Sequence, residues 1–101
     1  MEKNDCCVVG EFFKLFSNPL RLRILCALSE GVKTATDLTK ELNVSKHNLS
    51  QQLKVLNLVN IVAFEKKGRF IYCSIVDKEL LHLFKNISSH RSLKQFKKRG
   101  K

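Results

Sequence analysis

The sequence predicts a mainly α-helical domain that carries a small β-hairpin. Two observations support this fold class. Apolar residues recur at helical spacing through most of the chain, and two short β-rich runs follow one another between residues 60 and 75. A length of 101 residues fits one domain. We expect that domain to span residues 8–90, between a mobile segment at 1–7 and a basic, disordered tail at 91–101.

The middle of the chain reads as two helices joined by a tight turn. The first is short, over residues 36–42, and Asn43-Val44 forms the turn. Ser45 then caps a longer helix that runs to about Leu58. Leu49, Leu53 and Leu56 form an apolar stripe along one face of this longer helix. We expect this stripe to pack on a core.

The opposite face of the longer helix carries small polar and basic side chains. A helix that reads DNA needs such a face, because it must offer donors and acceptors to base edges without bulk. The order of elements therefore predicts a helix-turn-helix. The residues that we expect to face DNA are Ser45, Lys46, His47, Asn48, Ser50, Gln51 and Lys54.

A basic hairpin follows this helix. Its strands are expected at 60–65 and 69–75, and Lys66-Lys67-Gly68 joins them. A hairpin in this position is a wing, which contacts the DNA backbone or the minor groove. Its expected contacts are Lys66, Lys67 and Arg69. With a last helix at about 78–89, the prediction is a winged helix-turn-helix with five helices and a two-stranded wing.

The charge of the chain favours a polyanionic partner. Lys and Arg number 19 against 9 Asp and Glu, which gives a net charge of +10. Nucleic acid is the first candidate, and an anionic membrane is the second. The chain has no run of about 20 apolar residues that could span a bilayer. It also has no glycine-rich phosphate loop and no paired catalytic carboxylates, so we expect a cytoplasmic binding protein rather than an enzyme or a membrane protein.

The first and last helices carry more large apolar groups than a small domain buries easily. The first, expected to begin at Val8, has three phenylalanines within five residues. Such a surplus predicts that the two helices form a homodimer interface. The residues expected there are Phe12, Phe13, Phe16, Leu80, Leu83 and Phe84.

Three segments resemble the ArsR/SmtB family of metal-sensing repressors. Asn18 to Leu25 is similar to the family's second-helix signature, and Lys67 to Tyr72 is similar to its wing. Leu42 to Leu56 is similar to its recognition helix, with Gln52 where histidine is common. The resemblance covers about residues 11–90. It implies a homodimer that binds an imperfect palindrome in double-stranded operator DNA and is released by a ligand.

The first candidate ligand site is the adjacent pair Cys6 and Cys7. Two neighbouring thiols on a polar segment have no packing role, and some arsenic- and cadmium-sensing members of the family place vicinal cysteines there. Soft thiolates favour arsenite, cadmium, lead or copper(I). A third ligand has to come from the partner chain, Cys73, a carboxylate or solvent. The alternative interpretation is an incidental pair of cysteines.

The resemblance suggests a second candidate set, Asp77, Glu79 and His90, because zinc and nickel sensors of the family use ligands on the last helix. Helix capping by Asp77 and a solvated His90 are the alternative. Cys26 matches a cysteine of the family's redox sensors, but the last helix lacks its partner. Cys26 lies among leucines and Cys73 alternates with Ile71 and Ile75, so we expect both cysteines to be buried. Thus the repressor could also be metal-independent or thiol-responsive. A winged helix that binds protein or RNA is a remote alternative.

Overall fold

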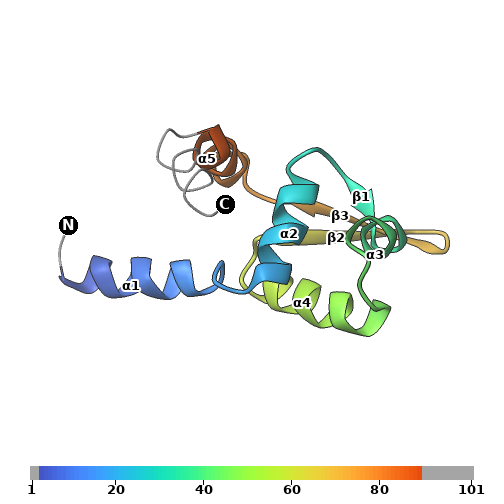
Figure 1. The fold of residues 1–101 in the computed structure, drawn as a ribbon, viewed down its shortest axis with the longest axis horizontal. Helices are drawn as coiled ribbons and strands as arrows, with labels where there is room; N and C mark the ends of the chain where they lie inside the picture. The colour runs from blue at the N-terminus through green and yellow to red at the C-terminus, as the bar shows by residue number, and fades with distance from the viewer. Residues whose placement is uncertain (1–2, 90–101) are drawn as a thin grey trace, which may run out of the picture.

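The computed structural model describes residues 3–89 and has five helices and one three-stranded sheet within this range. Helices α1 and α5 lie at one end of the molecule, and the hairpin of β2 and β3 extends at the other (Figure 1). In chain order the elements are α1 (Lys3–Lys14), α2 (Pro19–Leu28), β1 (Lys33–Thr34), α3 (Ala35–Leu42), α4 (Lys46–Leu58), β2 (Val62–Lys67), β3 (Phe70–Ile75) and α5 (Lys78–Ser89).

Side-chain caps begin the helices after α1. The Asn18 side chain accepts hydrogen bonds from the backbone N–H groups of Leu20 and Arg21, at 2.9 and 3.2 Å, and Pro19 occupies the first turn of α2. Each cap satisfies backbone donors that a helix N-terminus leaves unpaired. The cap expected at Ser45 is confirmed, Asp77 also has the capping role, and Thr34 caps the start of α3.

The turn between α3 and α4 is made by one left-handed residue. Asn43 has a φ of 53°, a conformation that asparagine tolerates better than most residues. The backbone N–H of Val44 donates to the Thr39 carbonyl at 3.2 Å, and the Arg23 guanidinium donates to the Leu42 carbonyl at 2.7 Å. These bonds close the C-terminus of α3 and fix the direction in which the chain enters α4.

The sheet contains three strands in the order β1-β3-β2, so the expected two-stranded wing is corrected. The hairpin itself is present, with Lys67 opposite Phe70 and Gly68 at a φ of 61° in the turn. The additional strand β1 is two residues long and pairs Thr34 with Tyr72. A strand this short has no readable alternation of apolar and polar residues, and backbone pairing with β3 alone defines it.

The core lies between α2, α3, α4 and the sheet. The leucine stripe expected on α4 is buried, and α2 contributes four further buried residues. Phe12 of α1 packs against this cluster from one side, together with Leu15 and Phe16 of the turn that follows, and all three are half-buried. The buried residues are Ile24, Leu25, Ala27, Leu28, Leu38, Leu42, Leu49, Leu53, Leu56, Ile61, Val62, Cys73 and Leu80.

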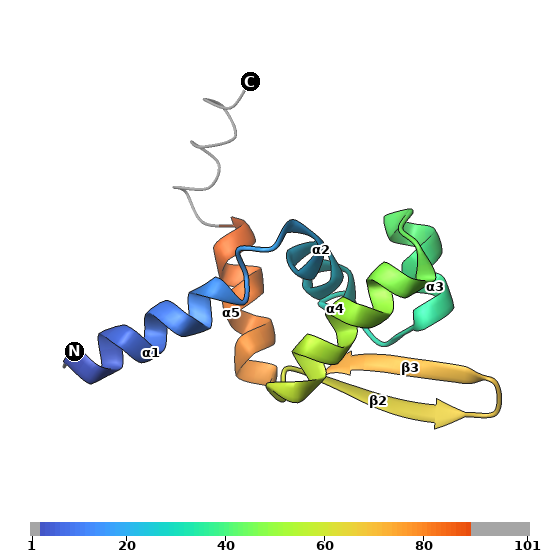
Figure 2. The same ribbon diagram turned by 90° about the horizontal axis from the view of Figure 1, so that it is seen from below.

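Helix α1 begins at Lys3, which corrects the helix start expected at Val8. Cys6 and Cys7 therefore lie within a helix rather than before one. This helix projects away from the body of the molecule in both views (Figures 1 and 2). The basic tail expected at 91–101 lies outside the described residues.

Candidate nucleic-acid interface

The outward face of α4 is polar and accessible. All seven residues expected to face DNA on this helix are exposed, whereas the leucine stripe on the opposite side is buried. Ser45 caps the helix by accepting a hydrogen bond from the Asn48 N–H at 3.1 Å, so its side chain also serves the fold. The polar face is therefore held rigidly by a helix anchored through its other side.

Gln52 has a different role from its neighbour Gln51. Its side-chain oxygen accepts a 2.7 Å hydrogen bond from the Arg21 guanidinium of α2, and both side chains are half-buried. This bond ties α4 to α2. Sequence reasoning missed it because the two residues are 31 positions apart. The available signal was the position of Gln52 beside the leucine stripe, at the edge of the buried face.

The wing presents three exposed cations with different surroundings. Lys66 and Lys67 point to opposite faces of the hairpin, because successive strand residues alternate. Lys67 lies 3.7 Å from the Glu65 carboxylate and 5.9 Å from the centre of the Tyr72 ring. Such exposed contacts are weak and leave the charge available to a stronger anionic partner. Arg69 lies in the turn.

The helix face and the wing lie on one side of the molecule. Figure 2 shows α4 and the hairpin of β2 and β3 beside each other, with the hairpin reaching past the end of the helix. These two elements carry five exposed cations, Lys46, Lys54, Lys66, Lys67 and Arg69. A polyanion laid across this side would meet charge from both elements.

The opposite end of the molecule has an apolar surface. Phe13 on α1 is 57% exposed and Leu83 on α5 is 43% exposed. Beside them a hollow of about 500 Å³ lies between α1, the end of α4 and α5. It is lined by Phe12, Val59, Asn60, Ile61, Asp77, Glu79, Leu80 and Leu83. Of the expected interface residues, Leu80 is buried within its own chain, Phe12 and Phe16 are half-buried, and the side chain of Phe84 is outside the description.

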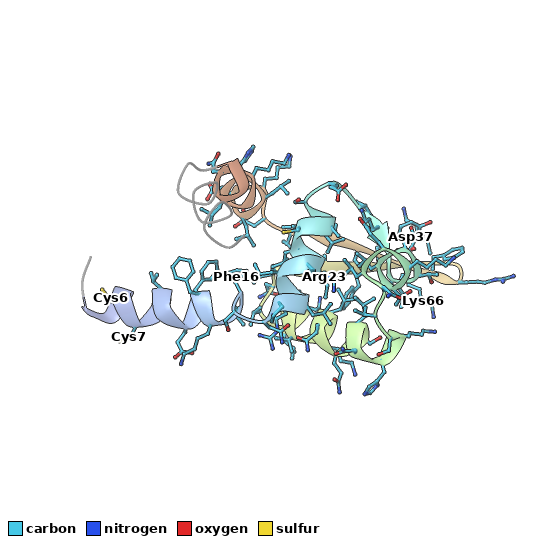
Figure 3. All side chains as sticks on the ribbon, in the orientation of Figure 1. Cys6, Cys7, Phe16, Arg23, Asp37 and Lys66 are labelled. Carbon is cyan, nitrogen blue, oxygen red and sulfur yellow. The ribbon has the colours of Figure 1, made fainter. Side chains whose placement is uncertain are left out.

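The four cysteines have two kinds of environment. Cys6 and Cys7 are exposed near the free end of α1 (Figure 3). Cys73 is buried as expected, and burial raises the pKa of its thiol to about 11. The burial expected for Cys26 is wrong, because this thiol is exposed. Apolar residues occur around much of α2, but only one side of the helix faces the core.

The second candidate metal set is not assembled by the described residues. The Asp77 carboxylate accepts a 2.9 Å hydrogen bond from the Glu79 N–H, which is the capping role. His90 lies outside the described residues. Within residues 3–89, no group of three histidine, cysteine or acidic side chains comes close enough to hold a metal ion. No helix in the same range is long and apolar enough to cross a membrane.

The exposed polar helix and the adjacent basic hairpin define a DNA-binding protein of the winged helix-turn-helix class. A family model described as "Bacterial regulatory protein, arsR family" matches residues 18–63. The chain is 38% identical over 67 residues to the transcriptional repressor SdpR of Bacillus subtilis, a match that covers 66% of this chain and 74% of SdpR. The chain belongs to the ArsR family of bacterial regulatory proteins.

Two further comparisons agree with this family. A transcriptional repressor SmtB homolog of Synechocystis is 30% identical over 82 residues, which cover 81% of this chain but 62% of that protein. The crystal structure of Mycobacterium tuberculosis Rv0081 superposes with a TM-score of 0.76 at 31% identity, over 93% of this chain and 97% of that one. The resemblance read from the three sequence segments is thereby confirmed.

Proposed function

We propose that this protein is a transcriptional repressor that binds double-stranded operator DNA as a homodimer. The observation that carries the proposal is the rigid, polar face of α4 beside the cationic wing. Its support includes the net charge of +10 and the repressor names of SdpR and the SmtB homolog. In this proposal α4 enters the major groove and the wing follows the neighbouring backbone.

The proposed contacts divide into two kinds. Ser50 and Gln51 read base edges, because their short side chains carry both donors and acceptors. Lys46 and Lys54 neutralise phosphates, as do Lys66, Lys67 and Arg69 of the wing. His47 and Asn48 lie near the start of α4, where they meet either a base edge or the backbone. Sequence preference comes from the first group, and salt dependence comes from the second.

The proposed partner for the apolar end is a second copy of the chain. Phe13 and Leu83 leave large apolar areas in water, and the hollow beside them can receive side chains from another subunit. A twofold axis through this end would present two α4 helices to one DNA face. Their spacing should be about 34 Å, one turn of DNA, to match an imperfect palindrome.

The test is selection of binding duplexes from a random DNA library by the purified chain. We expect a palindromic consensus that binds at least a thousandfold more tightly than a scrambled duplex. Affinity should fall steeply with salt, and sedimentation should give a dimer. Equal affinity for the scrambled duplex, or tighter binding to an RNA duplex of the same sequence, would contradict the proposal.

We further propose release by a thiophilic ion, such as arsenite, cadmium, lead or copper(I), bound through Cys6 and Cys7. Support comes from the exposure of both thiols and their place on α1, beside the proposed dimer surface. Neighbouring helix residues point about 100° apart. The pair therefore needs a local change at the start of α1, or ligands from the second subunit, to close around one ion.

A thiol-responsive repressor is the second candidate. The observation that favours it is the exposed Cys26, which lines a hollow of about 390 Å³ with Leu22, Arg23, Ala27, Glu30, Glu41 and Leu42. An oxidant could reach this thiol without unfolding of the helix. Release of DNA by hydrogen peroxide that disappears in Cys26→Ser, but not in a Cys6→Ser, Cys7→Ser double variant, would favour this candidate.

A further inference from the structure

A small hollow lies between the outward side of α4 and the wing. Its volume is about 180 Å³, which is the space of about six water molecules and far too narrow for a helix. The polar groups on its wall are Ser50 and Lys54 of α4, both exposed, and the rest of the wall is apolar. It is lined by Ala35, Ser50, Leu53, Lys54, Phe64 and Ile71.

The register of the hairpin brings two exposed apolar side chains to this hollow. Phe64 is opposite Cys73 and Ile71 is opposite Lys66, so all four share one face of the sheet. Phe64 is 39% exposed and Ile71 is 43% exposed. Lys66 lies next to them on the same face, and Figure 3 labels it on the hairpin. The hollow is therefore largely apolar, with Lys54 of α4 on its wall and Lys66 of β2 beside Ile71.

This combination fits one unit of the DNA backbone. A sugar-phosphate strand is anionic at intervals, and between two phosphates it presents the carbon-rich edge of a sugar. Lys54 and Lys66 are placed for the phosphates, and Phe64 and Ile71 are placed for the sugar. A strand that leaves the groove holding α4 and passes toward the wing must cross the gap between these two elements.

We propose that this hollow binds a 2-deoxyribose of the operator backbone and that Phe64 and Ile71 make the protein selective for DNA over RNA. The proposal rests on the DNA-binding function proposed above. The C2′ methylene of deoxyribose is apolar and can lose its water against Phe64 and Ile71. A ribose would bring a 2′-hydroxyl to the same wall, where burial without a hydrogen-bond partner costs affinity.

The test is a scan of single ribonucleotides through the selected DNA duplex, measured by fluorescence anisotropy with the full chain. We expect affinity to fall about tenfold at one or two positions in each half-site, with less than twofold change elsewhere. In Ile71→Ser the loss at those positions should shrink below twofold, since the apolar wall is opened and a hydroxyl is supplied. Phe64→Ser should have the same effect, and it replaces Ile71→Ser in the test if that variant does not fold.

The matched control is Phe70→Ser. Phe70 neighbours Ile71, is 49% exposed and points to the opposite face of the hairpin, so this variant should keep the tenfold loss. A flat ribonucleotide scan with normal binding to the all-deoxy duplex would overturn the inference and leave the proposed function standing. An Ile71-dependent loss on replacing thymine by uracil, with a flat ribonucleotide scan, would assign the hollow to a base methyl instead. Failure to bind the all-deoxy duplex would overturn both proposals.

Discussion

The two ends of the molecule differ in where one chain leaves large apolar side chains exposed. Around α3, α4 and the sheet, the large apolar residues of the core are buried, and the helices begin at side-chain caps. Around α1 and α5, Phe13 and Leu83 remain exposed beside a hollow of about 500 Å³. The first region closes a core within one chain, and its exposed apolar side chains Phe64, Phe70 and Ile71 lie on the wing. The second region leaves its exposed apolar side chains beside this hollow.

This difference separates the proposed DNA-reading surface on α4 from the proposed assembly surface on α1 and α5. A reading surface must be rigid before DNA arrives, so it is built on a complete core. In the proposed dimer a second copy covers the apolar surface at the other end, so one chain does not need to bury it.

Phe13→Glu should cause the largest loss. A carboxylate in the proposed interface would be desolvated without a partner, so the dimer should dissociate at micromolar concentration and operator affinity should fall about a thousandfold. Sedimentation and anisotropy measure the two effects. Val32→Glu is the matched control, since Val32 is 62% exposed and belongs to neither α1 nor α5. A dimeric Phe13→Glu protein with normal affinity would move the interface elsewhere.

Replacing all three wing cations by alanine should weaken binding by up to about a hundredfold at physiological salt. Specific and non-specific duplexes should be affected alike, and the slope of log affinity against log salt should flatten by up to about three units. The control removes three exposed lysines from the other end, Lys14, Lys78 and Lys85. If both triple variants change the slope equally, net charge alone acts and the wing has no special contact.

Gln51→Ala should lose about 1 to 3 kcal/mol of binding free energy on the selected operator and little on a scrambled duplex, because in the proposed complex the Gln51 amide reads a base edge. Lys54→Ala offers the contrast, with similar losses on both duplexes, since phosphate carries no sequence. Binding titrations on the two duplexes give both numbers. Equal losses for Gln51→Ala on the two sequences would make Gln51 a backbone contact.

The Arg21–Gln52 hydrogen bond should contribute about 1 kcal/mol to the free energy of unfolding. Urea unfolding of Arg21→Met, Gln52→Met and the double variant measures the coupling between them. The control is a second cycle that combines Arg21→Met with Gln51→Met. The coupling of Gln51 with Arg21 should be near zero because Gln51 points outward. Zero coupling for Arg21 with Gln52 as well would show that the bond adds no stability.

Serine at Cys6 and Cys7 should leave operator affinity unchanged, within twofold, and should abolish release by arsenite or cadmium. The exposed thiols should react rapidly with a maleimide in the native protein. Cys73 should stay unreactive below its raised pKa of about 11, because it is buried. If the double-serine variant still releases DNA on addition of the ion, the sensor lies elsewhere.

Much of the helical framework and the polar face of α4 could be predicted from the sequence because their signals are local. The helix starts are indicated by residues whose side chains cap them, Asn18, Ser45 and Asp77. The leucine stripe of α4 repeats at helical spacing. The same periodicity identified which face of α4 is polar. The sequence therefore predicts that this face is exposed, but it does not predict which elements lie beside it.

The features that were missed depend on residues far apart in the chain. Strand β1 exists because it pairs with β3, some forty positions later. Cys26 looks buried in the pattern of α2, but which side of that helix meets the core is a tertiary fact. The start of α1 at Lys3 was missed because the residues before Val8 are mostly polar and offer no apolar periodicity.

Strand β1 has a mechanical consequence. Its backbone pairs with β3 of the wing, and the Lys33 ammonium of the same strand lies 2.6 Å from the Glu41 carboxylate of α3. The wing is thereby coupled to the helix that precedes the turn into α4. A torque applied to the hairpin would pass into α3 rather than bend the hairpin alone. In the proposed dimer, the wing and the helix-turn-helix of each subunit should therefore move together when DNA binds or leaves.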